Sequence, residues 1–156
     1  MLQRRTLLLG GMGVGKTAIF RRITGAPFTE RYLPTVVVQK SELSQQDTLS
    51  QLELWDLTGE MTVNKIPLAY LKVAALILYV YDLSRPPSKA FLSSELKSLK
   101  SLAPDCPVLV IGNKLDLIKE NTANWNPVKR QTDLFLSAKT LENLEHLSEK
   151  LTHQFI

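Results

Sequence analysis

The sequence predicts an α/β fold: a mostly parallel sheet of six strands, with one antiparallel edge strand and with helices on both faces. Two continuous apolar runs, Ala74–Tyr81 and Pro107–Ile111, are typical of strands that are covered on both sides. Between them, Leu92, Leu96 and Leu99 recur at helical spacing. Because strand-like and helix-like segments alternate along the chain, we expect the strands to pair mainly in parallel.

The remaining elements are predicted in chain order. Thr6–Leu9 predicts a short strand that ends at a glycine, and Thr17–Ile23 predicts a helix. Val36–Leu43 and Leu49–Asp56 predict two strands around a polar turn, and this pair supplies the antiparallel edge strand. Leu134–Leu136 predicts the last strand. A final helix is predicted from five apolar residues at helical spacing: Leu141, Leu144, Leu147, Leu151 and Phe155.

Composition narrows the class of protein. The 156 residues predict one domain over residues 1–156, with a core of ordinary size. The net charge of +4 comes from scattered basic residues, which favours a solvated surface and no nucleic-acid partner. The single cysteine, Cys106, indicates a reducing compartment, so a cytoplasmic location is expected. No signal peptide is expected, and Ala74–Tyr81 is too short to cross a membrane.

A glycine-rich loop follows the first predicted strand and precedes the first predicted helix. Gly10–Thr17, GGMGVGKT, fits the pattern G-x-x-x-x-G-K-[ST] in the strand-then-helix context that this pattern requires. Glycines let backbone N–H groups wrap a phosphate chain, and the helix start adds a positive end. Lys16 can place a charge against the outer phosphates, and Thr17 can offer a hydroxyl to Mg²⁺. The loop therefore predicts a nucleoside-triphosphate site without specifying the base.

The motif DLTG, residues 56–59, follows the third predicted strand. Asp56 can cap a turn, or it can hold a metal ion through water beside the glycine-rich loop. Gly59 can offer its backbone N–H to a terminal phosphate because it has no side chain to block the approach. Alone, D-x-x-G is common by chance.

Two further motifs follow the fifth and sixth predicted strands and indicate guanine. Asp116, in NKLD, can accept from the two donors of guanine, N1–H and the exocyclic amine, a pair that adenine lacks. Ala138, in SAK, can donate its N–H to O6, and Asn113 can tie the loops together. The stems of Lys114 and Lys139 can cover the two faces of the base.

GGMGVGKT, DLTG, NKLD and SAK, in this order, resemble the motifs of small GTPases of the Ras superfamily over nearly the whole chain. The resemblance implies the P-loop NTPase (small G-protein) fold, with GTP or GDP as ligand and Mg²⁺ as cofactor. FTERYLPT, residues 28–35, resembles the first switch loop. By that match Phe28 packs against guanine, Tyr32 closes over the phosphates, and Thr35 binds Mg²⁺ and the γ-phosphate.

The motifs and the resemblance together imply three sets of residues. The nucleotide-binding set is Gly11, Met12, Gly13, Val14, Gly15, Lys16, Thr17, Ala18, Phe28, Tyr32, Pro34, Thr35, Gly59, Asn113, Lys114, Asp116, Leu117, Ser137, Ala138 and Lys139. The metal-binding set is Thr17, Thr35 and Asp56. The catalytic set is Lys16, Thr35, Gly59 and Glu60.

A partner surface is implied by similarity to the Rab branch. LELWD resembles the Rab pattern, and Trp55 and Tyr70 match two of the three residues that Rab proteins present to partners. The third position, aromatic in Rab proteins, is Lys40. LPT, before the second predicted strand, is more like Ras or Rho. The resemblance therefore implies effectors at the switch surface, an exchange factor and a GTPase-activating protein, without assigning a subfamily.

Two departures from the family pattern concern hydrolysis. Glu60 stands where the family has a glutamine that orients the attacking water. A carboxylate cannot donate to the γ-phosphate, and it adds negative charge beside a developing anion. Met12 stands where Ras has glycine, near the entry of an arginine finger. We expect weak intrinsic hydrolysis, with lineage drift and intact hydrolysis as the alternative.

The end of the chain also departs from the family. The segment between Asp116 and Ser137 is short, so NTANWNPVKRQ is expected to form an abbreviated helix or a loop. The chain stops inside its last predicted helix without a prenylation cysteine, so membrane association is not supported unless the native protein is longer.

Two function classes remain open. One is a switch that binds partners in the GTP state and hydrolyses GTP slowly. The other is a GTP-binding interaction module with negligible hydrolysis, which could belong to a longer protein. Asp116 and the SAK loop disfavour a third class, an ATP-using P-loop kinase.

Overall fold

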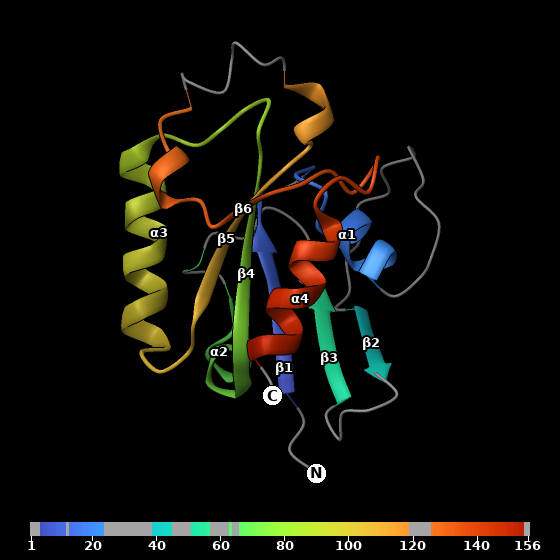
Figure 1. Ribbon diagram of the computed structural model, residues 1–156. Coiled ribbons are helices and arrows are strands. Elements are labelled where there is room, and N and C mark those ends of the chain that lie inside the picture. The colour runs from blue at the N-terminus through green and yellow to red at the C-terminus, as the bar shows by residue number, and fades with distance from the viewer. Residues whose placement is uncertain are drawn as a thin grey trace.

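The computed structural model describes residues 4–11, 13–23, 39–44, 51–56, 63, 66–118 and 126–154. Its centre is a six-stranded sheet in the order β2-β3-β1-β4-β5-β6. The strands are β1 (Arg4–Gly10), β2 (Gln39–Ser44), β3 (Gln51–Asp56), β4 (Ala74–Asp82), β5 (Val108–Asn113) and β6 (Leu134–Phe135). Four neighbouring pairs run parallel, and β2 pairs antiparallel with β3 at one edge. The predicted fold class is thus confirmed (Figure 1).

Helices cover both faces of the sheet, as predicted (Figure 1). The helices are α1 (Lys16–Ile23), α2 (Leu68–Val73), α3 (Lys89–Leu102) and α4 (Leu144–Gln154), with short 3-10 helices η2 (Leu115–Leu117) and η4 (Lys129–Gln131). Leu7 and Leu9 of β1 belong to a core cluster with residues of α2 and α3. Leu8, between them, belongs to a second cluster with residues of α1 and α4. This alternation along β1 places one core on each face of the sheet.

Helix α3 illustrates how the sequence positions an element. Ser88 caps its first turn, because its side-chain oxygen accepts from the N–H of Phe91 at 3.1 Å. Leu92, Glu95 and Leu99 are its buried residues, at the spacing of one helical face. The apolar face of α3 therefore contains one carboxylate.

Several predicted boundaries differ from the structure by a few residues, and two of these differences have a clear physical reason. The strand predicted to end at Ile111 continues to Asn113, because Gly112 and Asn113 keep their parallel pairing with Tyr81 and Asp82 of β4. Leu141, predicted on the last helix, precedes it: its φ is +70° and its side chain is half exposed. Asn143 also has a positive φ, so the chain turns here and the helix begins at Leu144.

The sequence prediction assigned no helix to Leu68–Val73, which forms α2. Of the final predicted face, Phe155 lies outside the described residues. Cys106 lies in the connection before β5, and burial raises the pKa of its thiol to about 11. The thiol is therefore protonated at neutral pH, as suits a packing role rather than a reactive one.

The connection before β6 is compact where the structure describes it, from Asn126 onward. It contains η4, and Val128 is fully buried. The hydroxyls of Tyr81 and Thr132 are 2.8 Å apart, and the amide of Asn126 donates to the Tyr81 hydroxyl at 3.0 Å. Asp133 then binds both backbone groups of Val110. Its backbone N–H donates to the carbonyl of Val110 at 2.8 Å, and a carboxylate oxygen accepts the N–H of Val110 at 2.7 Å.

Candidate guanine-nucleotide site

The glycine-rich loop joins the end of β1 to the start of α1, at the edge of the sheet where the parallel strands end. Gly15 has a φ of +97°, and a Cβ added there would overlap Nδ2 of Asn113. Only glycine fits this position, because both the backbone conformation and the neighbouring amide exclude a side chain. The carbonyl of Gly15 accepts the N–H of Ile19 at 3.0 Å, so the helix starts directly from the loop. The N–H groups of this first turn form an anion-binding end.

Lys16 is the charged group of the loop. It is only 6% exposed, and its Nζ donates to the carbonyl of Gly10 at 2.8 Å. The ammonium is therefore held inside the loop, where an anionic phosphate chain is the complementary ligand. Thr17 and Ala18 follow on the first turn of α1, both half-buried.

Asn113 links the glycine-rich loop to the SAK loop, residues 137–139. This side chain is 2% exposed at the end of β5. Its Nδ2 donates to the carbonyl of Val14 at 3.0 Å, and its Oδ1 accepts the N–H of Ala138 at 3.1 Å. The structure therefore contains the tie between the loops that the sequence analysis expects of Asn113.

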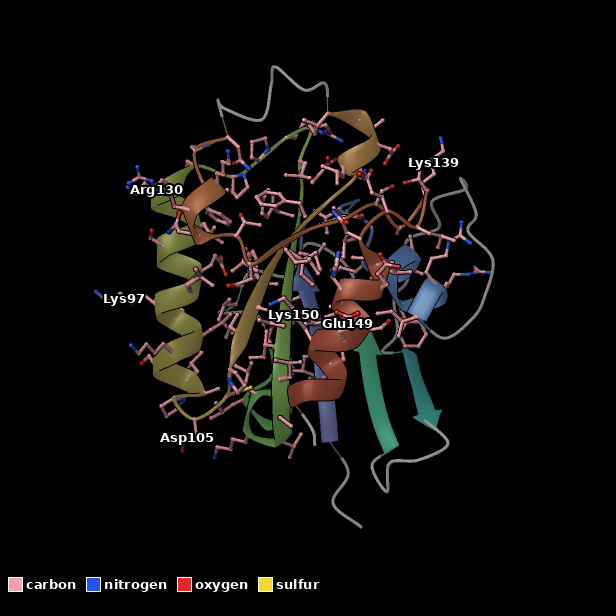
Figure 2. The ribbon with its side chains drawn as sticks, viewed as in Figure 1. Lys97, Asp105, Arg130, Lys139, Glu149 and Lys150 are labelled. Carbon is pink, nitrogen blue, oxygen red and sulfur yellow. The ribbon has the colours of Figure 1, made fainter. Side chains whose placement is uncertain are left out.

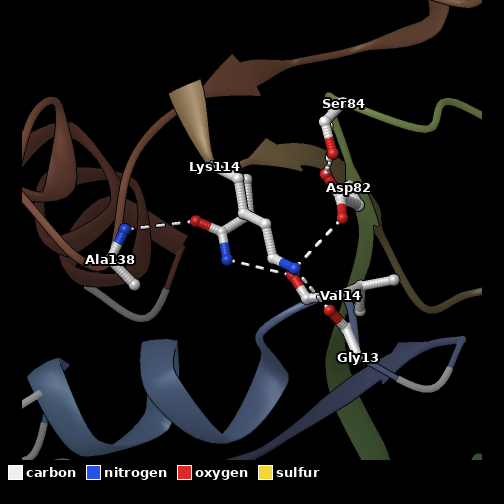
Figure 3. Close-up of polar contacts among 7 residues, drawn as sticks. Gly13, Val14, Asp82, Ser84, Lys114 and Ala138 are labelled. Atoms are coloured by element: carbon white, nitrogen blue, oxygen red, sulfur yellow. Dashed lines mark hydrogen bonds and ion pairs between the residues drawn. The ribbon is translucent and has the colours of Figure 1, made fainter. Parts of the chain in front are cut away.

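Lys114 reaches across to the glycine-rich loop. Its Nζ donates to the carbonyl of Gly13 at 2.7 Å and lies 3.0 Å from a carboxylate oxygen of Asp82 (Figure 3). Its φ is +66°, a left-handed conformation that turns the chain from β5 into η2. The stem of Lys114 thus spans the distance from the end of β5 to Gly13, with its charge neutralised by Asp82.

Asp82, at the end of β4, is a site residue that the sequence analysis missed. Its other carboxylate oxygen accepts from the backbone N–H of Ser84 at 2.8 Å and from the Ser84 hydroxyl at 2.6 Å. Burial raises the pKa of this carboxyl, but the hydrogen bonds from Ser84 and Lys114 outweigh burial and leave the pKa below its ordinary value. The sequence gives little indication of this role, because Asp82 is a single aspartate at the end of a predicted strand with no motif around it.

Asp116 and Ser137 form the base end of the site. The Ser137 hydroxyl donates to Oδ1 of Asp116 at 2.7 Å and accepts the N–H of Thr140 at 3.1 Å. Ser137 is fully buried, whereas Asp116 is exposed at the surface. A buried hydroxyl therefore fixes the orientation of an exposed carboxylate. Leu117, which follows Asp116, and Lys139, which follows Ala138, are both exposed.

The structure brings together the two loops that carry the predicted base and phosphate contacts. Several predicted site residues lie outside the described residues: Met12, Phe28, Tyr32, Pro34, Thr35, Gly59 and Glu60. Asp56 is the last residue of β3, where it pairs with Leu8 of β1 and Gln39 of β2. Of the predicted partner residues, Lys40 and Trp55 occupy opposed positions on β2 and β3, and Tyr70 lies half-buried on α2.

A sheet with a P-loop after its first strand and an NKLD loop tied to that P-loop defines a small GTPase. The sequence profile of the Ras family matches residues 5–156, and the chain belongs to that family. In the part of the chain that the structure describes, no helix has the length and apolar character to cross a membrane.

Three similar proteins are Rab proteins by name. Ras-related protein Rab-4 of Dictyostelium discoideum is 27% identical over 155 residues, which cover 94% of this chain and 76% of that protein. Rab-32D of the same organism is 27% identical over 169 residues, covering 99% of this chain and 74% of that protein. Rab-12 of Mus musculus is 31% identical over 115 residues, covering 72% of this chain and 47% of that protein. The chain is thus a Rab-like small GTPase of the Ras superfamily, a class whose members bind GTP or GDP with Mg²⁺.

Proposed function

We propose that this chain is a guanine-nucleotide switch that binds GTP and GDP with Mg²⁺, binds partners in its GTP state and hydrolyses GTP slowly. The observation that carries the proposal is the position of Asn113, whose amide group binds both Val14 and Ala138. Through it, the loop for the phosphates and the loop for the base are held at a fixed spacing. A nucleotide needs such spacing because its two ends must be recognised together.

The phosphate end of the proposed site uses the glycine-rich loop. Lys16 would exchange its contact with Gly10 for the phosphates, and the backbone N–H groups at the start of α1 would donate to phosphate oxygens. Lys114 would stay on the carbonyl of Gly13, since Asp82 holds its ammonium there. The loop would thereby keep its shape when the ligand leaves.

The metal-binding residues would be Thr17, Thr35 and Asp56. Two hydroxyls and one carboxylate are hard oxygen donors, which fit Mg²⁺. Thr17 lies on the first turn of α1, and Asp56 ends β3, which is hydrogen-bonded to β1 next to the loop. The ion, when bound, would neutralise charge on the β- and γ-phosphates. Removing Mg²⁺ with a chelator should accelerate nucleotide release; unchanged release would contradict this part of the proposal.

The base end would read guanine through Asp116 and Ala138. Because the buried Ser137 hydroxyl donates to Oδ1 of Asp116, the carboxylate is already oriented before a base binds. Guanine would supply two donors to the carboxylate, and its O6 would share the Ala138 N–H with Oδ1 of Asn113 in a bifurcated hydrogen bond. Leu117 and Lys139 would cover the base from the exposed side.

The proposed hydrolysis is slow because Glu60 cannot donate a hydrogen bond to the γ-phosphate. Met12 would add to this effect, since it stands where Ras has glycine, near the entry of an arginine finger. The proposed effectors would bind Lys40, Trp55 and Tyr70, and an exchange factor and a GTPase-activating protein would act on the switch. We place this activity in one domain, residues 1–156, in the cytoplasm. The second candidate, an interaction module with negligible hydrolysis, is favoured only by Glu60 and Met12.

The test is competition binding with labelled GDP. Unlabelled GTP and GDP should displace it at concentrations far below those of ATP, because adenine lacks the paired donors that Asp116 accepts. Asp116→Asn should weaken guanine binding and improve xanthine binding, since the amide donates to the 2-oxo group. Equal displacement by ATP and GTP would exclude the guanine site. Phosphate release from bound GTP then separates the switch from the non-hydrolysing module.

A further inference from the structure

Arg22, on the last turn of α1, binds backbone carbonyls of the SAK loop, which carries part of the proposed base site. Its Nε donates to the carbonyl of Ala138 at 2.9 Å, and its Nη2 donates to the carbonyl of Lys139 at 3.0 Å. The two acceptors are consecutive carbonyls, so the guanidinium acts as a two-pronged donor. These contacts join residues that are 116 and 117 positions apart in the sequence.

The loop that Arg22 holds is a chain of turns. Residues 138–140 form a turn between β6 and α4, so their carbonyls lie outside the regular hydrogen bonding of a helix or strand. On the opposite side, the N–H of Ala138 donates to Asn113. Arg22 and Asn113 thus hold Ala138 from both of its peptide groups, while its side chain packs in the core cluster with residues of α1 and α4 and is only 2% exposed.

The helix that carries Arg22 also carries the phosphate-binding residues. Lys16 and Thr17 begin α1, and Arg22 stands about 9 Å further along the axis, at about 1.5 Å per residue. A short helix is rigid on this scale, so one element contacts the phosphate loop at one end and the base loop at the other. This gives the two halves of the site a second connection besides Asn113.

We propose that Arg22 is a positioning residue: it fixes Ala138 and Lys139 on α1 and thereby slows the release of guanine nucleotide. The inference rests on the proposed function, because it concerns the same site. In this role Arg22 would contact the loop and not the base. It acts by keeping the Ala138 N–H where the base would meet it, so its loss lets the loop move and shortens the residence time of the nucleotide.

The experiment measures release of ribose-labelled GDP from the full chain, chased with unlabelled GDP in the presence of Mg²⁺. Arg22→Met should release GDP about tenfold faster, since two partly exposed charge-assisted hydrogen bonds are lost. Arg22→Lys should lie between Arg22→Met and the unmodified chain, because an ammonium lacks the planar fork. Association rates should change little.

Lys97→Met is the matched control. It removes one positive charge from α3, on the opposite flank of the molecule from Lys139 and α1 (Figure 2). Release by this variant should equal that of the unmodified chain. Arg22→Gln serves as a neutral second variant that retains one donor, should Arg22→Met fail to fold.

Hydrogen exchange of the amides of residues 137–140 in the GDP-bound chain separates positioning from a general loss of stability. These amides should exchange faster in Arg22→Met and at the unmodified rate in Lys97→Met. Unchanged release, or faster release without faster exchange in the loop, would overturn the inference. Failure of the unmodified chain to bind labelled GDP would instead overturn the proposed function, and the inference with it.

Discussion

The carboxylate of Glu95, on α3, accepts the backbone N–H of Val63 at 2.9 Å. Both residues are buried: Glu95 is 8% exposed and Val63 is 2% exposed. Val63 follows Glu60 by three positions, so this bond anchors the chain shortly after the motif DLTG. Burial raises the pKa of the nearby Tyr79, and the charge of Glu95 raises it further. A charged side chain in an apolar helix face is therefore used to hold a backbone segment.

Glu95→Met should destabilise the protein by about 1–2 kcal/mol, because it leaves the buried N–H of Val63 without its acceptor. Glu95→Gln keeps an acceptor oxygen and should destabilise it much less. Urea unfolding gives both values. Glu145→Met, which removes an exposed carboxylate from α4, is the control and should have little effect. Equal stability of Glu95→Met and Glu145→Met would show that the contact with Val63 contributes nothing.

Asp82→Asn should reduce the pH dependence of stability at low pH. The pKa of Asp82 lies below its ordinary value of 3.8, so the carboxylate stabilises the folded chain above that pH. The contribution is lost as pH falls below 3.8 and through the lower pKa of the folded state. In the asparagine variant this part of the slope should be missing.

The measurement for Asp82 is urea unfolding of the two proteins from pH 5 to the acid limit of folding. The variant should be less stable at pH 5, and the difference should shrink toward low pH. A constant difference across the range would mean that the pKa of Asp82 is not lowered in the folded state. The variant should also release labelled GDP faster, because Lys114 loses the charge that holds it beside Gly13.

Gly15→Ala should be much more damaging than Gly13→Ala. Both positions have positive φ, which strains a non-glycine residue by about 1–3 kcal/mol. A Cβ at Gly13 meets nothing within 4 Å, whereas a Cβ at Gly15 would overlap the amide of Asn113. Gly13→Ala is therefore the matched control for backbone strain alone. Thermal unfolding of the nucleotide-free proteins should rank Gly15→Ala clearly lower; equal melting temperatures would contradict the close contact with Asn113.

Glu60→Gln should raise the rate of intrinsic GTP hydrolysis by roughly tenfold, or about 1.4 kcal/mol of barrier. Glutamine restores a donor to the γ-phosphate while GTP affinity should change little. Single-turnover hydrolysis of preloaded GTP measures this rate. Met12→Gly should be tested alone and with Glu60→Gln, since Met12 can mask the gain. No gain in either background would remove Glu60 as the cause of slow hydrolysis.

The parts of the fold that could be predicted depend on local pattern. Ala74–Tyr81 was recognisable as a strand because it is apolar throughout, and β4 occupies it with one further residue. The glycine-rich loop was recognisable because its backbone conformations restrict residue type at fixed spacing. Leu141 was misassigned because its spacing continues that of Leu144 and Leu147, whereas its positive φ depends on a turn that spacing does not encode.

The parts that could not be predicted depend on distant partners. Glu95 meets Val63 from 32 positions away, and Arg22 meets Ala138 from 116 positions away. In sequence, Glu95 interrupts a leucine pattern and Arg22 is one of two adjacent arginines. Neither context differs from that of a solvated side chain. Their roles depend on tertiary contacts: the segment before α2 lies against α3, and the loop after β6 lies against α1.

Asp133 has a consequence for how the molecule behaves among its own copies. Strand β6 is only two residues long, which would leave the outer side of β5 open at Val110. An incoming strand from another molecule would need the N–H and carbonyl of Val110, and Asp133 already engages both. Asp133 therefore closes β5 at Val110 to pairing with a strand of another molecule, which acts against edge-to-edge aggregation.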